Sequence, residues 1–158
     1  MLLKRPEKRL GAEMPAGEEI DSDDGPHKQI HVELLIRHPS LTPAEISAAL
    51  GLEAQRSTCV GDPRKTPKGT PLPGRYARTA WRHGAEYEVT EQWFADKIAM
   101  LVDRLVPHRD FLRHVRATGG DACVIVQFII DSYFSDAVGL DTLCKLVDLQ
   151  LDFGIERY

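Results

Sequence analysis

The residues best suited to chemistry lie in one basic stretch rich in proline and glycine, residues 56–83. From position 56 to 82 the chain carries seven Lys and Arg residues against the single acid Asp62. Guanidinium and ammonium groups gathered in a loop are typical of anion-binding sites. Trp81 stands among these cations, so its ring belongs either to the core or to the floor of a pocket. The candidate binding residues are Gly61, Arg64, Lys65, Arg78, Trp81 and Arg82.

Other motifs do not support catalysis or metal binding. The order Lys68-Gly69-Thr70 is wrong for a phosphate loop, and nearby prolines remove N–H donors that such a loop needs. His108 and His114 are six residues apart, so they do not share a helix face and do not make a helical metal site. Cys59 lies beside the basic loop, but no sequence motif indicates a His or Asp partner that would activate its thiol. We therefore do not predict that Cys59 is a nucleophile. We therefore predict no catalytic residue, no metal site and no cofactor.

Charge is distributed unevenly along the 158 residues, whose net charge is −4. Residues 1–26 are highly charged, and residues 13–24 hold six acids and no base, so we expect a flexible N-terminal arm. Residues 27–158 then form a single domain. The basic loop can be a solvated surface on which the acidic arm rests, or an anion site. The net acidic charge and the lack of interleaved aromatic residues argue against nucleic-acid binding.

The cysteines and the longest apolar run indicate a cytoplasmic protein. Three cysteines without CxxC spacing argue against a disulfide framework and for a reducing compartment. Cys123 and Cys144 lie on predicted packed elements and are expected in the core. The run 122–130 is half the length that a membrane span needs, so no membrane association is predicted.

The hydrophobic patterns predict alternating strands and helices. Residues 30–36 alternate as a strand, and Thr42, Pro43 and Glu45 form a capping box that begins a helix ending at Gly51. Residues 53–74 are expected to be irregular, because their prolines disrupt ladders and helices. Extended chain follows at 75–83, and a long helix is expected over 90–116, interrupted at Pro107. Residues 121–133 form a strand that is apolar on both faces, and a short helix and a last strand end the chain.

An internal repeat suggests how these elements are arranged. Leu41-Thr42 and Leu50-Gly51-Leu52 have the same spacing as Leu140-Asp141 and Leu149-Gln150-Leu151. Two such strand–helix–strand halves predict an α+β fold, a ferredoxin-like (split βαβ) two-layer sandwich. We expect a four-stranded, mostly antiparallel sheet, with a long helix inserted between the halves. The short helices cover one face, and the long helix or a second subunit covers the other.

Several of these motifs together resemble a bacterial family catalogued as domain of unknown function 4279. The resemblance covers residues 28–158 and rests on 38–46, 50–52 and 61–63, on Trp81 before the long helix, and on 151–155 with Tyr158. It implies a small bacterial α+β protein without assigned catalytic residues. Nothing carries over from it to the arm at 1–26 or to the Arg-rich run 75–82, which are expected to be particular to this chain.

The function predicted from these features is non-enzymatic binding or protein interaction, with a protein partner or a homodimer as candidate assemblies. An immunity-type protein that blocks a partner toxin is one form of such a module. The alternative is a small enzyme or ligand-binding protein that holds a small anionic ligand at the 56–83 loop. Under that alternative, Arg78→Ala and Trp81→Ala would abolish binding while leaving the fold intact.

Overall fold

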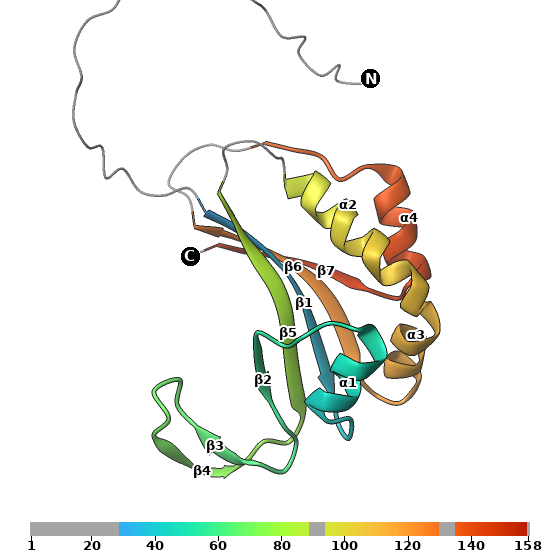
Figure 1. Ribbon diagram of the computed structural model, residues 1–158. Helices are drawn as coiled ribbons and strands as arrows, with labels where there is room; N and C mark the ends of the chain where they lie inside the picture. The colour runs from blue at the N-terminus through green and yellow to red at the C-terminus, as the bar shows by residue number, and fades with distance from the viewer. Residues whose placement is uncertain (1–28, 89–93, 130–134, 158) are drawn as a thin grey trace, which may run out of the picture.

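A curved five-stranded mixed sheet is the centre of the molecule (Figure 1). The computed structural model describes residues 29–88, 94–129 and 135–157. The expected arm at 1–26 and the start of the expected long helix at Thr90 lie outside these residues. The described strands are β1 (Gln29–His38), β2 (Arg56–Thr58), β3 (Pro63–Lys65), β4 (Pro71–Arg75), β5 (Thr79–Glu88), β6 (Asp121–Ile129) and β7 (Asp152–Arg157). The described helices are α1 (Pro43–Leu50), α2 (Phe94–Leu105), the 3₁₀ turn η1 (Val106–His108), α3 (Arg109–Ala117) and α4 (Leu140–Asp148).

The strand order confirms a mixed α+β fold but corrects the four-stranded ferredoxin-like sheet. The order is β2-β5-β1-β6-β7, in which β1 is antiparallel to both neighbours and β7 is parallel to β6. In the first half, β5 lies between β1 and β2, which is the split arrangement that the repeat predicted. In the second half no strand lies between β6 and β7, so β6–α4–β7 is an ordinary crossover between adjacent parallel strands.

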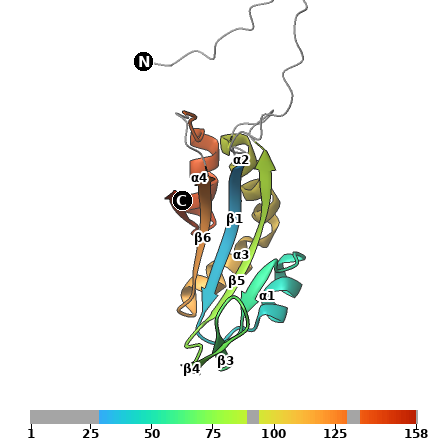
Figure 2. The ribbon, with the colours of Figure 1, turned by 90° about the vertical axis from the view of Figure 1, so that its left-hand side faces the viewer.

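All the described helices pack on the same face of the sheet (Figures 1 and 2). They cover the even-numbered side chains of β1 and β6, so Leu34, Ile36, Val124 and Val126 are buried. From the helices come Ile46, Ile98, Leu112 and Leu146, which complete this core. The long helical segment is divided at Pro107, as predicted, but it joins the short helices instead of covering the second face. That second face has no helix over it among the described residues.

The residues at 53–74 are more regular than their prolines suggested. β3 and β4 form a small two-stranded antiparallel sheet, with a register shift between Pro63 and Lys65. Both strands are fully exposed, so the missing N–H groups face water and disturb no central ladder. The β3–β4 hairpin (residues 63–75) projects from one end of the molecule on the helix-free side (Figure 1).

The two copies of the repeat end their helices in the same way. Gly51 after α1 has φ 62°, and Gln150 after α4 has φ 55°. In the second copy the amide of Leu151 donates to the carbonyl of Leu146, and that of Gln150 donates to Val147, which is a Schellman motif. Leu52 and Leu151 then return to the core. In both copies of the repeat, therefore, the helix is followed by a residue with left-handed backbone conformation, a glycine in the first copy and a glutamine in the second.

Gln150→Gly is expected to stabilise the protein. A side chain at positive φ costs about 1–2 kcal/mol, and the extra freedom of glycine in the unfolded chain offsets part of this gain. We expect the free energy of unfolding to rise by about 0.5–1 kcal/mol in urea denaturation. Glu53→Gly is the matched control, because Glu53 is also exposed but is not at positive φ. Equal losses of stability in both variants would contradict the prediction.

Candidate functional site

The helix-free face of the sheet carries a polar network that crosses four strands. Register places Arg82, Glu33 and Gln127 on this face, on β5, β1 and β6 respectively. The Arg82 guanidinium donates to the Glu33 carboxylate, and Gln127 Nε2 lies 3.4 Å from the same oxygen, Glu33 Oε1. Gln127 Nε2 also donates to Glu156 on β7, at 2.8 Å. This network holds the side chains of the face in place.

Two apolar residues of the same face are buried although none of the described helices covers them. Leu35 and Ile125 are 6% and 5% exposed. Leu35 lies opposite Arg82, and Ile125 lies opposite Glu33, in the register of the sheet. Long charged side chains cover apolar neighbours with their aliphatic stems. The second apolar face of β6 is thus covered by the side chains of polar residues on neighbouring strands of the same sheet.

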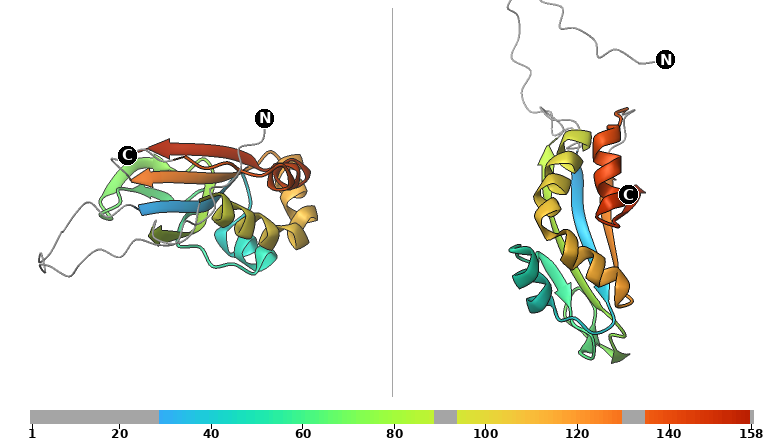
Figure 3. Two further views of the ribbon diagram at one scale, coloured as in Figure 1. Left: turned by 90° about the horizontal axis from the view of Figure 1, so that it is seen from above. Right: turned by 90° about the vertical axis from the view of Figure 1, so that its right-hand side faces the viewer.

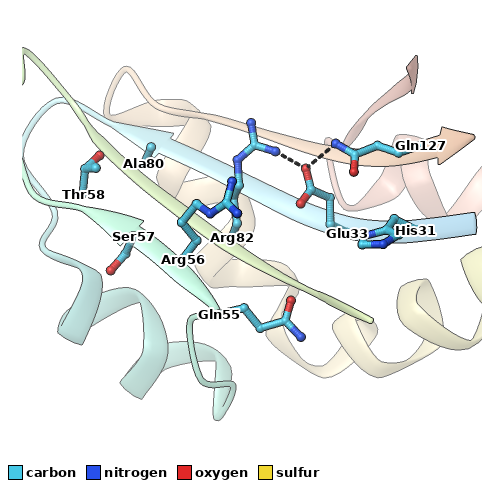
Figure 4. A pocket seen from close by; sticks show the side chains of 9 residues that line it. All are labelled: His31, Glu33, Gln55, Arg56, Ser57, Thr58, Ala80, Arg82 and Gln127. Carbon is cyan, nitrogen blue, oxygen red and sulfur yellow. Dashed lines mark hydrogen bonds and ion pairs between the residues drawn. The ribbon is translucent and has the colours of Figure 1, made fainter. Parts of the chain in front are cut away.

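An open cavity of about 530 Å³ lies over this face at the β2 end (Figure 4). Arg56 on β2 lies directly opposite Arg82 on β5, so two guanidinium-bearing side chains line the same wall. Arg82 is paired with Glu33, whereas no carboxylate of the described residues is within ion-pairing distance of Arg56. Like charges directly opposite each other on a sheet are unfavourable. An anion placed between them would relieve that repulsion.

A second, open cavity of about 840 Å³ adjoins the first and is bordered by the β3–β4 hairpin. The two cavities share Arg56, Ser57 and Thr58 in their walls. The hairpin is held at its base by Tyr76, whose carbonyl accepts from the Gly61 amide at 2.9 Å. Gly61 has φ 84°, a conformation that favours glycine at this turn. The hairpin therefore has a defined position beside the helix-free face.

Only some of the predicted site residues come together. Arg82 lines the first cavity and Lys65 lines the second, while Arg64 is exposed on the hairpin. Arg78 lies apart from both: its guanidinium is 3.7 Å from the Asp121 carboxylate and donates to the Gly119 carbonyl at 3.2 Å.

Trp81 belongs to the core and does not line a pocket. Its side chain is 0% exposed and packs on the helix side of the sheet, beside Ile36. Its indole Nε1 donates to Ser47 Oγ of α1 at 3.0 Å. Because Trp81 and Arg82 are consecutive in β5, they necessarily point to opposite faces. Of the two interpretations of Trp81, its burial supports the core.

Sequence reasoning missed the residues that complete the first cavity. Glu33, His31 and Gln127 come from β1 and β6 and line it together with Arg56. A usable signal was present, because His31 and Glu33 alternate with the buried residues of β1. The pattern could not show that this polar face stays uncovered, since that depends on where the long helix packs.

The three cysteines lie in different surroundings. Cys123 is on the helix-free face, where burial, followed by the nearby carboxylate of Asp152, raises the pKa of its thiol. A raised pKa keeps the group a thiol near neutral pH and makes it a poor nucleophile. Cys59 is half-buried and lines the second cavity. Cys144 is exposed on α4 and Cys123 is only half-buried outside the core, so the prediction that both lie in the core is wrong.

Two further properties concern metals and membranes. Within residues 29–88, 94–129 and 135–157, no group of three or more His, Cys, Asp or Glu side chains is arranged to hold a metal ion. No helix in the same ranges is long and apolar enough to cross a membrane.

Comparison with known proteins supports the resemblance inferred from the motifs. A family model described as Domain of unknown function (DUF4279) matches residues 28–158. No curated protein and no solved structure matches the chain. The family match extends over every helix and strand of the described structure. The chain therefore belongs to the DUF4279 family.

Proposed function

We propose that this chain is a non-enzymatic binding module that holds an acidic protein partner against the helix-free face and the β3–β4 hairpin. The observation that carries the proposal is a sheet face with no described helix over it, flanked by cations that form no ion pair with a described carboxylate. Arg56 borders both cavities, and Arg64, Lys65 and Lys68 lie on the exposed hairpin. No ion pair joins any of these four cations to a carboxylate of the described residues.

The extent of this surface favours a macromolecular partner. The two cavities share lining residues of β2 and are both open, so with the hairpin they offer a broad surface rather than an enclosed pocket. Protein interfaces use such broad, polar surfaces, whereas small-molecule sites enclose most of their ligand. Charge complementarity then selects an acidic partner and speeds its encounter.

A small anion is the second candidate, favoured by the opposed guanidinium groups of Arg56 and Arg82. Cross-strand like charges cost about 0.2–1 kcal/mol, and a bridging carboxylate or phosphate would offset that cost. This candidate needs only the first cavity and does not use the hairpin. The two candidates can therefore be separated by substitutions in the hairpin.

The test titrates a polyglutamate peptide into the full chain by calorimetry. Combining Arg56→Glu with Lys65→Glu is expected to weaken binding at least about tenfold, equivalent to about 1.4 kcal/mol. Raising the salt concentration should weaken it further, because exposed charges are screened. Arg104→Glu on α2 is the control for each of the two charge reversals made singly, since Arg104 is an exposed cation on the helix side.

Three results would reject or redirect the proposal. Equal weakening by Arg104→Glu would mean that only net charge matters. Binding of inorganic phosphate that Arg56→Glu removes and Lys65→Glu leaves unchanged would favour the small-anion candidate. Binding of a single-stranded oligonucleotide in preference to polyglutamate would identify a nucleic-acid partner instead.

A further inference from the structure

One flank of the molecule gathers most of its exposed large apolar side chains. Seven such side chains are exposed among the described residues, and five of them belong to α4 and β7. They are Leu140, Leu143 and Val147 of α4, and Phe153 and Ile155 of β7. We call these five residues the β7 flank. Soluble proteins rarely gather exposed apolar residues in one place unless the surface binds something.

The α4 part of the β7 flank points away from the rest of the helical layer. Leu140, Leu143 and Val147 have i, i+3, i+7 spacing and share one side of the helix. Lys145, which pairs with Asp103 of α2 at 2.8 Å, lies about 140–200° around the helix from them. In Figure 3, α4 lies beside α2 at the border of the helical layer. The apolar stripe therefore faces outward, on the side where the sheet ends.

The β7 part of the flank is an unpaired strand edge. β7 is the last strand in the sheet order, so one side of its backbone has no neighbour among the described strands. The opposite edge, β2, has only three residues and carries Arg56, features that discourage pairing. β7 has six residues, no proline and no lysine, and Ile155 on it is 66% exposed. Such an edge is a template for another strand.

We propose that the β7 flank is a homodimer interface, in which β7 pairs antiparallel with β7 of a second copy. A second copy fits because the strand is complementary to itself when the pairing is centred on Ile155. In an antiparallel pair of identical strands related by a two-fold axis, opposed residues lie on the same face of the sheet. The axis therefore passes between the two copies of one residue, and that residue lies opposite itself. With Ile155 at the centre, Ile155 meets its own copy, Phe153 lies opposite Arg157, and Gly154 lies opposite Glu156.

Neighbouring registers are less favourable. Centring the pair on Gly154 would place Asp152 opposite Glu156, and centring it on Glu156 would place two glutamates together. Like charges directly opposite destabilise a sheet pair, whereas Arg157 over the Phe153 ring is a favourable cation–π arrangement. The same two-fold axis brings the outward stripes of the two α4 helices toward each other. Apolar burial and backbone pairing thus occur at one interface.

This inference is independent of the proposed function, because the helix-free face and the hairpin stay open in the dimer. The two sheets would join into one ten-stranded sheet, by the arithmetic of five strands from each copy. The surface of the protein thereby divides into one polar face for a partner and one apolar flank for self-association.

Sedimentation velocity of the full chain, over a concentration series, tests the dimer. We expect dimer at micromolar concentration and at least a hundredfold weaker association in Ile155→Lys, which sets two cations opposite each other. Met100→Lys is the matched control, because Met100 is 61% exposed on α2 outside the β7 flank. Monomer at every concentration, or equal weakening in both variants, would overturn the proposal.

Cysteine cross-linking tests the register. In a background with Cys59→Ser and Cys144→Ser, Ile155→Cys should form an intermolecular disulfide on mild oxidation. Arg157→Cys should not, because two copies of position 157 would lie about 14 Å apart, beyond disulfide reach. Failure of Ile155→Cys to cross-link in a dimeric sample would assign the dimer to another surface.

Discussion

Trp81→Ala is expected to cost the protein about 3–5 kcal/mol of unfolding free energy, the usual range for removing a buried tryptophan. The side chain is 0% exposed and lies between β1 and α1. Its removal leaves a cavity and also deprives Ser47 Oγ of the indole N–H donor. Because small domains have only about 5–15 kcal/mol of stability, the variant should be substantially destabilised at physiological temperature. Urea denaturation followed by circular dichroism measures the loss.

Trp81→Phe is the informative companion variant. It keeps most of the apolar volume and removes the hydrogen bond to Ser47, so a smaller loss is expected than for alanine. The interpretation of Trp81 as a pocket residue makes the opposite prediction, namely lost ligand binding with stability unchanged. A loss below about 1 kcal/mol in Trp81→Ala, as for an ordinary surface substitution, would contradict the core assignment.

His38 is expected to make the fold sensitive to acid. Its ring is 1% exposed at the end of β1, and Nδ1 accepts the backbone amides of Ser40 and Leu41 at 3.1 and 2.9 Å. Nε2 lies 2.8 Å from Thr118 Oγ1, which donates to the His114 carbonyl, so Nε2 carries the ring proton. Protonating Nδ1 would remove the acceptor that both amides use.

The direction of the pH effect follows from the pKa of His38. Burial, then the nearby His114 and Arg78, lower this pKa below its ordinary value of 6.5, and Glu45 opposes them. Below about pH 6.5 the unfolded chain therefore binds the proton more readily than the folded protein does. The contribution of neutral His38 to the free energy of unfolding is fully present above the pKa that His38 has in the unfolded chain. This contribution falls as the pH decreases toward the pKa of His38 in the folded protein, by at most about 1.4 kcal/mol per pH unit.

Two variants at position 38 separate the proton from the packing. His38→Asn can place its amide oxygen where Nδ1 now accepts, so it should reduce the loss of stability between pH 7 and 5. His38→Ala leaves two backbone donors without an acceptor and is expected to cost about 2–4 kcal/mol at neutral pH. Thermal unfolding across a pH series measures both. An unchanged pH slope in His38→Asn would assign the acid sensitivity to another group.

Local features of the fold followed directly from the sequence. The capping box at Thr42 and Glu45 is present as predicted, and its hydrogen bonds lower the pKa of Glu45. The break at Pro107 and the repeat that ends at Gly51 and Gln150 have direct structural counterparts. These features depend on neighbours a few residues apart, so short patterns describe them well.

The candidate site was only partly accessible to the same reasoning. The cations at Lys65 and Arg82 were identified because a basic run among prolines is conspicuous in any sequence. Glu33 and Gln127 were not, because each is an ordinary polar residue of a strand. They meet Arg82 only after β1 has paired with both β5 and β6.

The basic stretch 56–83, conspicuous in the sequence for its charges, forms β2, the β3–β4 hairpin and the first part of β5. The sequence by itself determined the strands β1, β5, β6 and β7, the helix ends and the alternation that separates Trp81 from Arg82. Tertiary structure decided that the long helix packs beside the short ones, and so which face of the sheet stays open. Alternation defines two faces of a strand but does not say which one a distant helix will cover, because that choice depends on packing across the whole core.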